Sequence, residues 1–280
     1  MHLRNVGSHW LRRYAVFVAC CTFVLVIAGG LVTSNDAALS IPDWPLSWGH
    51  LIPTLEGGIR YEFAHRVAAM LVGLLTVGLA VWMKSRLAWA AVAVVLAQAA
   101  LGGVAVRFVT PAWATIAHAS LGQLFFAIMV AICVRLCAGV DGALFAPALL
   151  CALGLFAQTI LGAAVRYGVV AAVGHIVGAV AATILVMWAA LSILLQHMDD
   201  SRLRRPAMLL LSVTFSQVFL GIGALMARVA YADAPQPMPL MVLFTVAHVA
   251  VGSLALGAAV ALAMLAQPEM FPADGGQVTA

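Results

Sequence analysis

Charged residues are scarce in this chain. Only 9% of its 280 residues are Asp, Glu, Lys or Arg, whereas 65% are hydrophobic. A soluble domain of this length could not bury so much apolar surface, so the composition excludes a soluble globular protein and predicts one that crosses a membrane several times. The net charge of +4 is modest, and we expect membrane lipid, not nucleic acid, around the protein.

Cysteine is also sparse, and its spacing indicates no metal or redox motif. The five cysteines fall within or beside apolar segments, and none belongs to a Cys-x-x-Cys pair: Cys20, Cys21, Cys133, Cys137 and Cys151. We therefore expect buried free thiols. We expect no cleavable signal peptide, because the first apolar segment is not followed by a small-residue cleavage site and then a soluble domain. The simplest location is a bacterial cytoplasmic (inner) membrane.

Long apolar segments, by contrast, are abundant. A bilayer core about 30 Å thick needs about 20 helical residues. Eight segments reach that length, at residues 14–33, 62–83, 87–107, 112–137, 144–166, 169–195, 207–229 and 239–266. The predicted fold class is therefore an all-α membrane protein with eight transmembrane helices.

Basic residues predict the orientation of these helices. Nine of the 14 lysines and arginines flank one side of the predicted spans. Because basic residues are typical of cytoplasmic loops, this asymmetry predicts that both termini are cytoplasmic.

An internal repeat divides the chain. A Gln-x-x-Leu-Gly pattern followed by an arginine ends one helix, and a histidine opens the next. The three clear copies are 98–102 with Arg107 and His118, 158–162 with Arg166 and His175, and 217–221 with Arg228 and His248. A looser copy places Gly29-Gly30 before His65. Four such hairpins predict two pseudo-symmetric four-helix bundles, at residues 1–140 and 141–280.

The four repeated histidines are the main candidates for function. His65, His118, His175 and His248 each lie a few residues inside an apolar segment, toward the outer face. An ionisable side chain in a bilayer is costly without a partner, and imidazole is a common axial ligand of heme. One such histidine could simply bond to a neighbouring helix, but four in repeat register favour two pairs of heme ligands.

Four arginines lie at a similar depth to the histidines: Arg66, Arg107, Arg166 and Arg228. Guanidinium groups suit carboxylates, so these side chains are candidates for binding heme propionates. The alternative is that they anchor the helix ends at the membrane interface.

The first hairpin departs from the repeat in two ways. Its outer loop, 34–61, is unusually long, and long structured loops are often lids. In addition, Glu62 precedes His65 by three residues, so both lie on one helix face. A carboxylate there could move protons during an oxidation. The alternative is a helix N-terminal residue that pairs with Arg66.

Together these motifs resemble the heme A synthase family, over residues 14–266. The segments that carry the resemblance, beside the helix-opening histidines, are Gly29-Gly30-Leu-Val-Thr-Ser34, Leu39-Ser-Ile-Pro-Asp-Trp-Pro45 and Glu62-Phe-Ala-His65-Arg66. The resemblance implies a membrane oxidoreductase that oxidises a porphyrin methyl group of heme O to a formyl group, giving heme A for terminal oxidases.

The resemblance also implies roles for individual residues. His175 and His248 would hold a heme b cofactor in the C-terminal half, while His65 and His118 would receive the substrate heme. Glu62 falls on the family's essential glutamate. An iron with two histidine ligands has no open position, so we expect the N-terminal pair to be labile and the C-terminal pair permanent.

The family implies partners and one point of departure. Heme O synthase is the expected source of substrate, and cytochrome oxidase assembly the expected consumer of heme A. Some members carry a cysteine pair in the first outer loop. This loop has none, so the basis for a thiol-dependent step or a disulfide is missing here.

Two other functions share some of these features. A diheme b-type electron-transfer cytochrome would use the same ligands, but all four histidines lie toward one face and only one half has the long loop and Glu62. A transporter built from two repeats would need charges near the midplane, whereas these are peripheral.

Overall fold

The structure is a computed structural model that describes residues 2–140 and 144–266, with side chains from residue 9 onward. In this part of the chain all regular elements are helices, and eight are long and apolar enough to cross a membrane, which confirms the predicted fold class. They are α1 (His2–Ser34), α2 (Ile59–Met83), α3 (Arg86–Arg107), α4 (Ala112–Ala138), α5 (Ala146–Arg166), α6 (Ala172–Gln196), α7 (Ser201–Ala230) and α8 (Pro239–Leu265).

The largest difference from the predicted spans, apart from the polar first turns of α1, is the start of α7. The prediction began at residue 207, directly after Pro206, whereas the helix begins at Ser201. The Asp200 carboxylate accepts a hydrogen bond from the Arg202 backbone N–H at 2.8 Å, which caps the first turn. Pro206 lies within the first two turns of α7, where few helical hydrogen bonds precede it. The helix therefore continues through this proline. The predicted break at Asp141-Gly142 lies outside the described residues.

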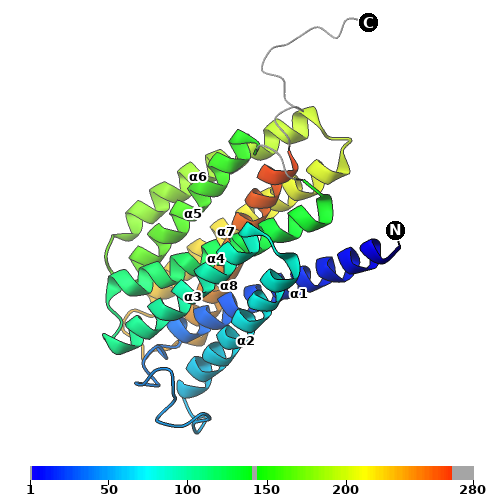
Figure 1. The fold of residues 1–280 in the computed structure, drawn as a ribbon. Helices are drawn as coiled ribbons and strands as arrows, with labels where there is room; N and C mark the ends of the chain where they lie inside the picture. Colours follow the sequence, from blue (N-terminus) through cyan, green and yellow to red (C-terminus); the bar gives the residue numbers. More distant parts are fainter. Residues whose placement is uncertain (1, 141–143, 267–280) are drawn as a thin grey trace, which may run out of the picture.

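The helices pack as two sets of neighbours (Figure 1). Among the first four, α1 and α3 each contact both α2 and α4; among the last four, α5 and α7 each contact both α6 and α8. Contacts between the sets run from α8 to α1 and α4, and from α4 to α5. The domain boundary at 140/141 and the pseudo-symmetry stay predictions.

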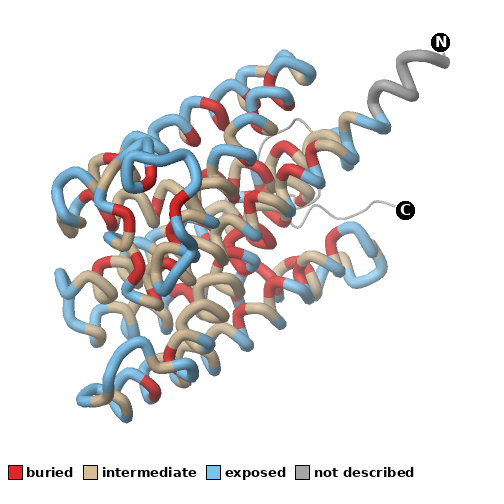
Figure 2. The backbone as a smooth tube through the Cα atoms, turned by 90° about the horizontal axis from the view of Figure 1, so that it is seen from below, coloured by how far each residue is buried: buried red, intermediate tan, exposed pale blue. Residues whose placement is uncertain are grey.

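Each set has its tightly packed apolar core near one end. In the first set the buried residues include Val18, Leu79 and Ile132, and in the second they include Ile193 and Leu262. The four that lie on even helices are near the ends of these helices, opposite the repeated histidines, whereas Val18 lies midway along α1. Figure 2 shows the buried stretches gathered between the helices, with exposed faces outside.

The cysteines are free, as expected, but not all are buried. Cys151 is buried, whereas Cys20 and Cys137 are exposed. The expectation of burial was wrong for these two because a helix of a small membrane bundle turns much of its surface outward, where lipid and not protein would cover an apolar side chain. The N-terminal end of α1 and the last turns of α8 lie toward the same end (Figure 1), and their cytoplasmic placement stays a prediction.

Candidate functional site

The four repeated histidines lie in two pairs. His65 on α2 and His118 on α4 have ring centroids 6.4 Å apart, with ring planes at 75°. His175 on α6 and His248 on α8 have ring centroids 6.1 Å apart, with ring planes at 80°. All four side chains are half-buried. Each half of the molecule thus contributes one imidazole pair, formed between its two even-numbered helices.

The ring separations suit an iron held between two imidazoles. With metal–nitrogen bonds of about 2 Å and about 1.2 Å from nitrogen to ring centre, two axial ligands need centroids about 6.4 Å apart. Two aromatic rings packed edge to face also lie at such distances. The distance alone therefore does not separate a metal site from ring packing, and the available metal ligands have to be compared. No group of three or more His, Cys, Asp or Glu side chains that could hold a metal lies within the described residues. A two-imidazole heme site therefore fits better than a multidentate metal centre.

A glycine of the preceding odd helix lies against every one of these rings. A Cβ added to each would approach the Cε1 atom of its histidine closely: 3.2 Å for Gly29 and His65, 3.2 Å for Gly102 and His118, 3.0 Å for Gly162 and His175, and 2.9 Å for Gly221 and His248. The sequence reasoning identified these glycines as part of the repeat but not as the surface against which the rings pack. A glycine recurs on the helix before each histidine, and this recurrence in the sequence could have indicated the contact.

The repeat glutamines also contact histidines. The backbone carbonyl of Gln98 lies 3.0 Å from Nδ1 of His118. In the C-terminal half the side chain makes the contact: the amide nitrogen of Gln158 lies 2.9 Å from Nδ1 of His175 and donates to the backbone carbonyl of the same residue at 2.7 Å. The Gln98 carbonyl can accept Nδ1–H of His118, which leaves Nε2 of that ring free to face a metal. The amide nitrogen of Gln158 instead donates to Nδ1 of His175, which places the ring proton on Nε2.

The other two histidines are held less closely. The amide nitrogen of Gln217 lies 3.3 Å from Nε2 of His248, whose Nδ1 is buried without a hydrogen-bond partner in the described part of the chain. Nδ1 of His65 is likewise buried without a partner among the described residues. No glutamine precedes His65 in the repeat, because Leu25 stands four residues before Gly29.

Glu62 is buried and bonded at both carboxylate oxygens. Oε2 accepts the backbone N–H of Ile41 at 2.9 Å, and Oε1 pairs with Nη2 of Arg66 at 2.5 Å. Arg66 in turn donates through Nη1 to the carbonyls of Asp43 at 2.7 Å and Leu46 at 2.9 Å. The alternative considered for Glu62, an ion pair with Arg66, is therefore present. The pair ties the loop between α1 and α2 to the start of α2, one turn from His65.

The loop, residues 35–58, is built to lie over the N-terminal half. The ring of Trp44 packs on α3, where a Cβ added to Gly103 would lie 3.1 Å from it. The carboxylate of Asp43 accepts the backbone N–H groups of Trp48 at 2.6 Å and Gly49 at 2.8 Å. These hydrogen bonds, that from Gly49 above all, hold the pKa of Asp43 below its usual value. The loop has a defined internal structure and covers helices α2 and α3.

The remaining arginines fall into two kinds. Arg166 donates to the carbonyl of Thr33 at 2.6 Å and lies 3.8 Å from the Asp36 carboxylate, so it joins α5 to the end of α1. Arg107 and Arg228 are exposed, and neither makes a hydrogen bond or ion pair with the described residues. Arg66 and Arg166 are thus already engaged by the protein, while Arg107 and Arg228 are open to a ligand carboxylate.

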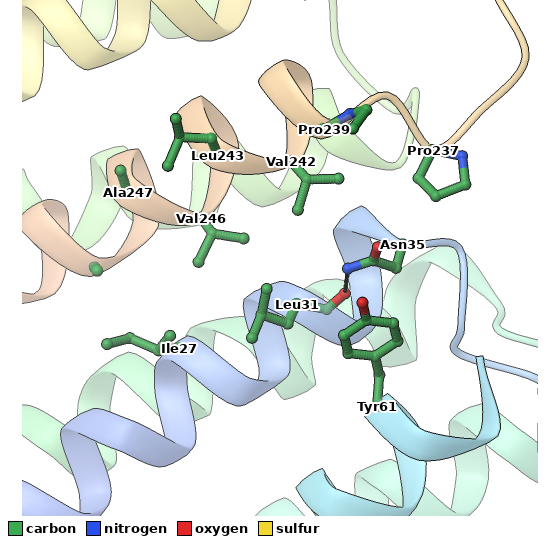
Figure 3. A pocket seen from close by; sticks show the side chains of 11 residues that line it. Ile27, Leu31, Asn35, Tyr61, Pro237, Pro239, Val242, Leu243, Val246 and Ala247 are labelled. Carbon is green, nitrogen blue, oxygen red and sulfur yellow. Dashed lines mark hydrogen bonds between the residues drawn. The ribbon is translucent and has the colours of Figure 1, made fainter. Parts of the chain in front are cut away.

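An apolar cleft of about 530 Å³ separates the two halves at this end. Figure 3 shows Ile27 and Leu31 of α1 facing Val242 and Val246 of α8, with Tyr61 at the start of α2. Some of its lining residues are near neighbours of Gly29 and His248 in the chain, so the cleft lies at a depth close to that of the histidine pairs. It offers an apolar surface beside both candidate heme sites.

Comparison with known proteins gives partial matches. No family model matches the chain. A protein named heme A synthase from Methylobacterium radiotolerans is 34% identical over 134 residues, 40% of this chain and 36% of that protein. One from Symbiobacterium thermophilum is 29% identical over 147 residues, 49% of this chain and 48% of that protein. One from Exiguobacterium sibiricum is 38% identical over 76 residues, 25% of this chain and 26% of that protein.

The aligned part of the chain spans about a quarter to a half of the length of these curated relatives. Eight curated proteins match in this way, and every one is named heme A synthase. Over a quarter to a half of its length, the chain is therefore similar to curated proteins named heme A synthase.

Proposed function

We propose that this protein is a membrane oxidoreductase that converts heme O to heme A, by oxidising one porphyrin methyl group to a formyl group. The observation that carries the proposal is the presence of two imidazole pairs, 6.4 Å and 6.1 Å between ring centroids, at one end of the bundle. The matched relatives, each named heme A synthase, support heme A biosynthesis as the process.

In this proposal the two pairs have different tasks. His175 and His248 hold a resident heme b, which supplies one-electron transfer when bound. His65 and His118 hold the substrate heme O. The assignment is supported by the loop, since only the N-terminal pair lies in the half that residues 35–58 cover. A covering loop suits a site where water must be excluded from a reaction.

Glu62 is the proposed proton acceptor of the reaction. Oxidation of a methyl carbon releases protons, and the Glu62 carboxylate lies one helical turn from His65. Its present partners are Arg66 and the N–H of Ile41, so taking up a proton would weaken its bond to Arg66. Because Arg66 also holds the loop through backbone carbonyls, protonation of Glu62 would loosen the loop at the same time.

The arginines are proposed to bind heme propionates. Arg107 and Arg228 are the better placed of the four, because neither is paired with a described residue. Arg66 and Arg166 already bind backbone carbonyls and a carboxylate, so they would have to exchange these partners for a propionate.

We place the protein in the bacterial cytoplasmic (inner) membrane, with both heme sites toward the outer face. Heme O would come from a heme O synthase, and the product would be passed to cytochrome oxidase assembly. Eight helices of membrane-spanning length support the multi-pass arrangement.

The test is the heme content of cells that express the full chain with a source of heme O and no heme A synthase of their own. Chromatography of extracted hemes should show heme A, and a His65→Ala/His118→Ala variant should show none. Bound b-type heme in the purified chain with no heme A in the cells would contradict the proposal and favour the diheme electron-transfer cytochrome.

A further inference from the structure

We propose that Arg166 is a positioning residue for the N-terminal heme site, although it belongs to a helix of the C-terminal half. Its guanidinium holds the end of α1 and the first residues of the loop, which lead to His65 and to Glu62. The inference rests on the proposed function, since it concerns the site of the substrate heme. It goes further by giving Arg166 a task in the other half, instead of a propionate of the resident heme.

The three arginines that end odd helices differ in their contacts. Arg107 and Arg228 are exposed and make no hydrogen bond or ion pair with the described residues. The side chain of Arg166 is only 25% exposed, and its Nη2 donates to the backbone carbonyl of Thr33 at 2.6 Å and lies 3.8 Å from Oδ1 of Asp36. Within the described residues, Arg166 is the one of the three that bonds to the other half. The shared repeat position therefore does not give these arginines a shared role.

Arg166 caps α1 from a separate helix. The last carbonyls of a helix have no partner within it and carry partial negative charge, and α1 has no basic residue in its last turn. The Thr33 carbonyl, next to the end of α1, accepts hydrogen bonds from the Arg166 guanidinium at 2.6 Å and from the backbone N–H of Asp36 at 3.3 Å. The positive charge that a helix C-terminus favours therefore comes to α1 from α5.

The capped end of α1 leads to the ring of His65. The Thr33 hydroxyl donates to the carbonyl of Gly29 at 3.2 Å, one turn back along α1. Gly29 is the residue whose added Cβ would lie 3.2 Å from Cε1 of His65. A shift of the last turn of α1 would therefore move the surface on which this imidazole packs.

The same cap fixes the start of the loop. Ala37, which directly follows the contacts of Arg166, is buried. It packs at the start of α2, because a Cβ added to Gly58 would lie 3.2 Å from the Cβ of Ala37. Four residues later, the backbone N–H of Ile41 donates to Glu62 at 2.9 Å. The loop start that Arg166 holds therefore leads directly to the proposed proton acceptor.

Two arginines thus hold the loop from different halves. Arg66, on α2, binds the carbonyls of Asp43 and Leu46 in the middle of the loop. Arg166, on α5, holds the end of α1 and lies beside Asp36 at the start of the loop. Loss of Arg166 should therefore loosen the start of the loop and leave its middle in place.

The first experiment measures amide hydrogen exchange in the purified full chain with its resident heme. Arg166→Gln should accelerate exchange of the Ala37 amide, which bonds to the last turn of α1, about tenfold, because a hydrogen bond from a charged group is lost. The Gly49 amide, which the Asp43 carboxylate holds, should exchange at the wild-type rate. The matched control is Arg228→Gln, which removes an exposed arginine from the next odd helix and should change the exchange of neither amide.

The second experiment measures heme binding at the N-terminal pair, which a general loosening of the fold would not change selectively. Iron protoporphyrin is titrated into the chain that already holds its resident heme. The part of the optical signal that is missing from His65→Ala/His118→Ala is assigned to the N-terminal pair. Arg166→Gln should weaken this binding about tenfold and leave the ratio of resident heme to protein unchanged. Arg166→Lys should restore the binding, since an ammonium group also donates to a carbonyl.

Three results would overturn the inference. They are exchange of the Ala37 amide at the wild-type rate in Arg166→Gln, equal acceleration in Arg228→Gln, and loss of the resident heme from Arg166→Gln while the added heme binds as in wild type. The last result would make Arg166 a ligand of the resident heme. The proposed function is judged separately, by heme A in cells that express the wild-type chain.

A second variant covers failure of Arg166→Gln to fold. Asp36→Asn removes the ionic partner of Arg166 at an exposed site and suits the backbone there, whose φ is 51°. Exchange of the Ala37 amide should rise about twofold, less than in Arg166→Gln, because an exposed ion pair contributes little. An unchanged rate would overturn the inference in this case.

Discussion

The two histidine pairs are built from the same residue types and differ in what surrounds them. In both, a glycine of an odd helix lies against each ring, and the ring centroids are a little over 6 Å apart. The N-terminal half adds a structured loop joined to Glu62 and Arg66. The C-terminal half has short connections at its histidine end and a glutamine side chain beside each histidine.

In the proposed function, this difference lets one repeated unit serve two tasks. The glycine and histidine positions are shared by both pairs. The C-terminal pair, which has glutamine side chains beside its rings, would hold the resident heme. The N-terminal pair, beside Glu62 and the loop, would receive the substrate heme. The following predictions test this contrast, from the largest expected effect to the smallest.

The largest effect is expected when one histidine of each pair is removed. His175→Ala should weaken binding of the resident heme more than about 100-fold, because a direct ligand matters more than an orienting partner. His65→Ala should leave that heme in place. The amount of bound heme b is measured from optical spectra of both purified variants. Equal loss of heme b in the two would end the division of tasks between the halves.

Glu62→Gln should stop heme A formation, by about 100-fold or more, while heme content stays near normal. The rate should fall because a proton acceptor contributes about this factor to the rate of a reaction. Heme binding should be kept because Glu62 bonds to the loop and to Arg66, and not to either histidine of the pair. Heme A extracted from expressing cells measures the rate, and the optical spectrum measures the heme. Glu56→Gln, an exposed loop glutamate, is the control and should retain activity. Continued heme A production by Glu62→Gln would exclude a catalytic role.

Gly162→Ala should reduce the resident heme about tenfold, since the new Cβ would lie 3.0 Å from Cε1 of His175 and push the ring away. Gly174→Ala is the matched control, because a Cβ there meets nothing within 4 Å. Gly29→Ala, in the N-terminal half, should leave the resident heme unchanged. Heme-to-protein ratios measure all three. Similar loss in Gly162→Ala and Gly174→Ala would show that ring position is not the cause.

The smallest effect is expected in the loop at low pH. The pKa of Asp43 in the folded loop lies below its ordinary value of 3.8. Its stabilising bonds to Trp48 and Gly49 are therefore fully present above that value, and they are lost as the pH falls through the folded pKa. Hydrogen exchange of the Trp48 and Gly49 amides in detergent should accelerate in that range.

Asp43→Asn should remove this pH dependence, and Glu56→Gln should retain it. Amide exchange that responds to pH equally in wild type and Asp43→Asn would assign the effect to another group. The resident heme in the C-terminal half should not respond in either variant, because Asp43 contacts only the loop and Arg66.

Much of the fold could be predicted because membrane helices are long, apolar and punctuated by polar turns. The exception at α7 came from Pro206, which a sequence pattern treats as a boundary and a helix tolerates near its start. For the site, the repeat placed His65, His118, His175 and His248 in equivalent positions. It did not show which ring faces which glycine, since that depends on how helices pack.

From the sequence alone, hydropathy determined eight membrane-length helices, and the period of the repeat placed four histidines near one end. Both follow from local chemistry, because each residue's polarity sets its depth in a bilayer. Only the tertiary structure showed how closely the rings of each predicted pair approach, that Glu62 bonds to both Arg66 and the loop, and that Nδ1 of His65 and of His248 has no partner among the described residues. These depend on contacts between segments far apart in the chain, which polarity and spacing do not specify.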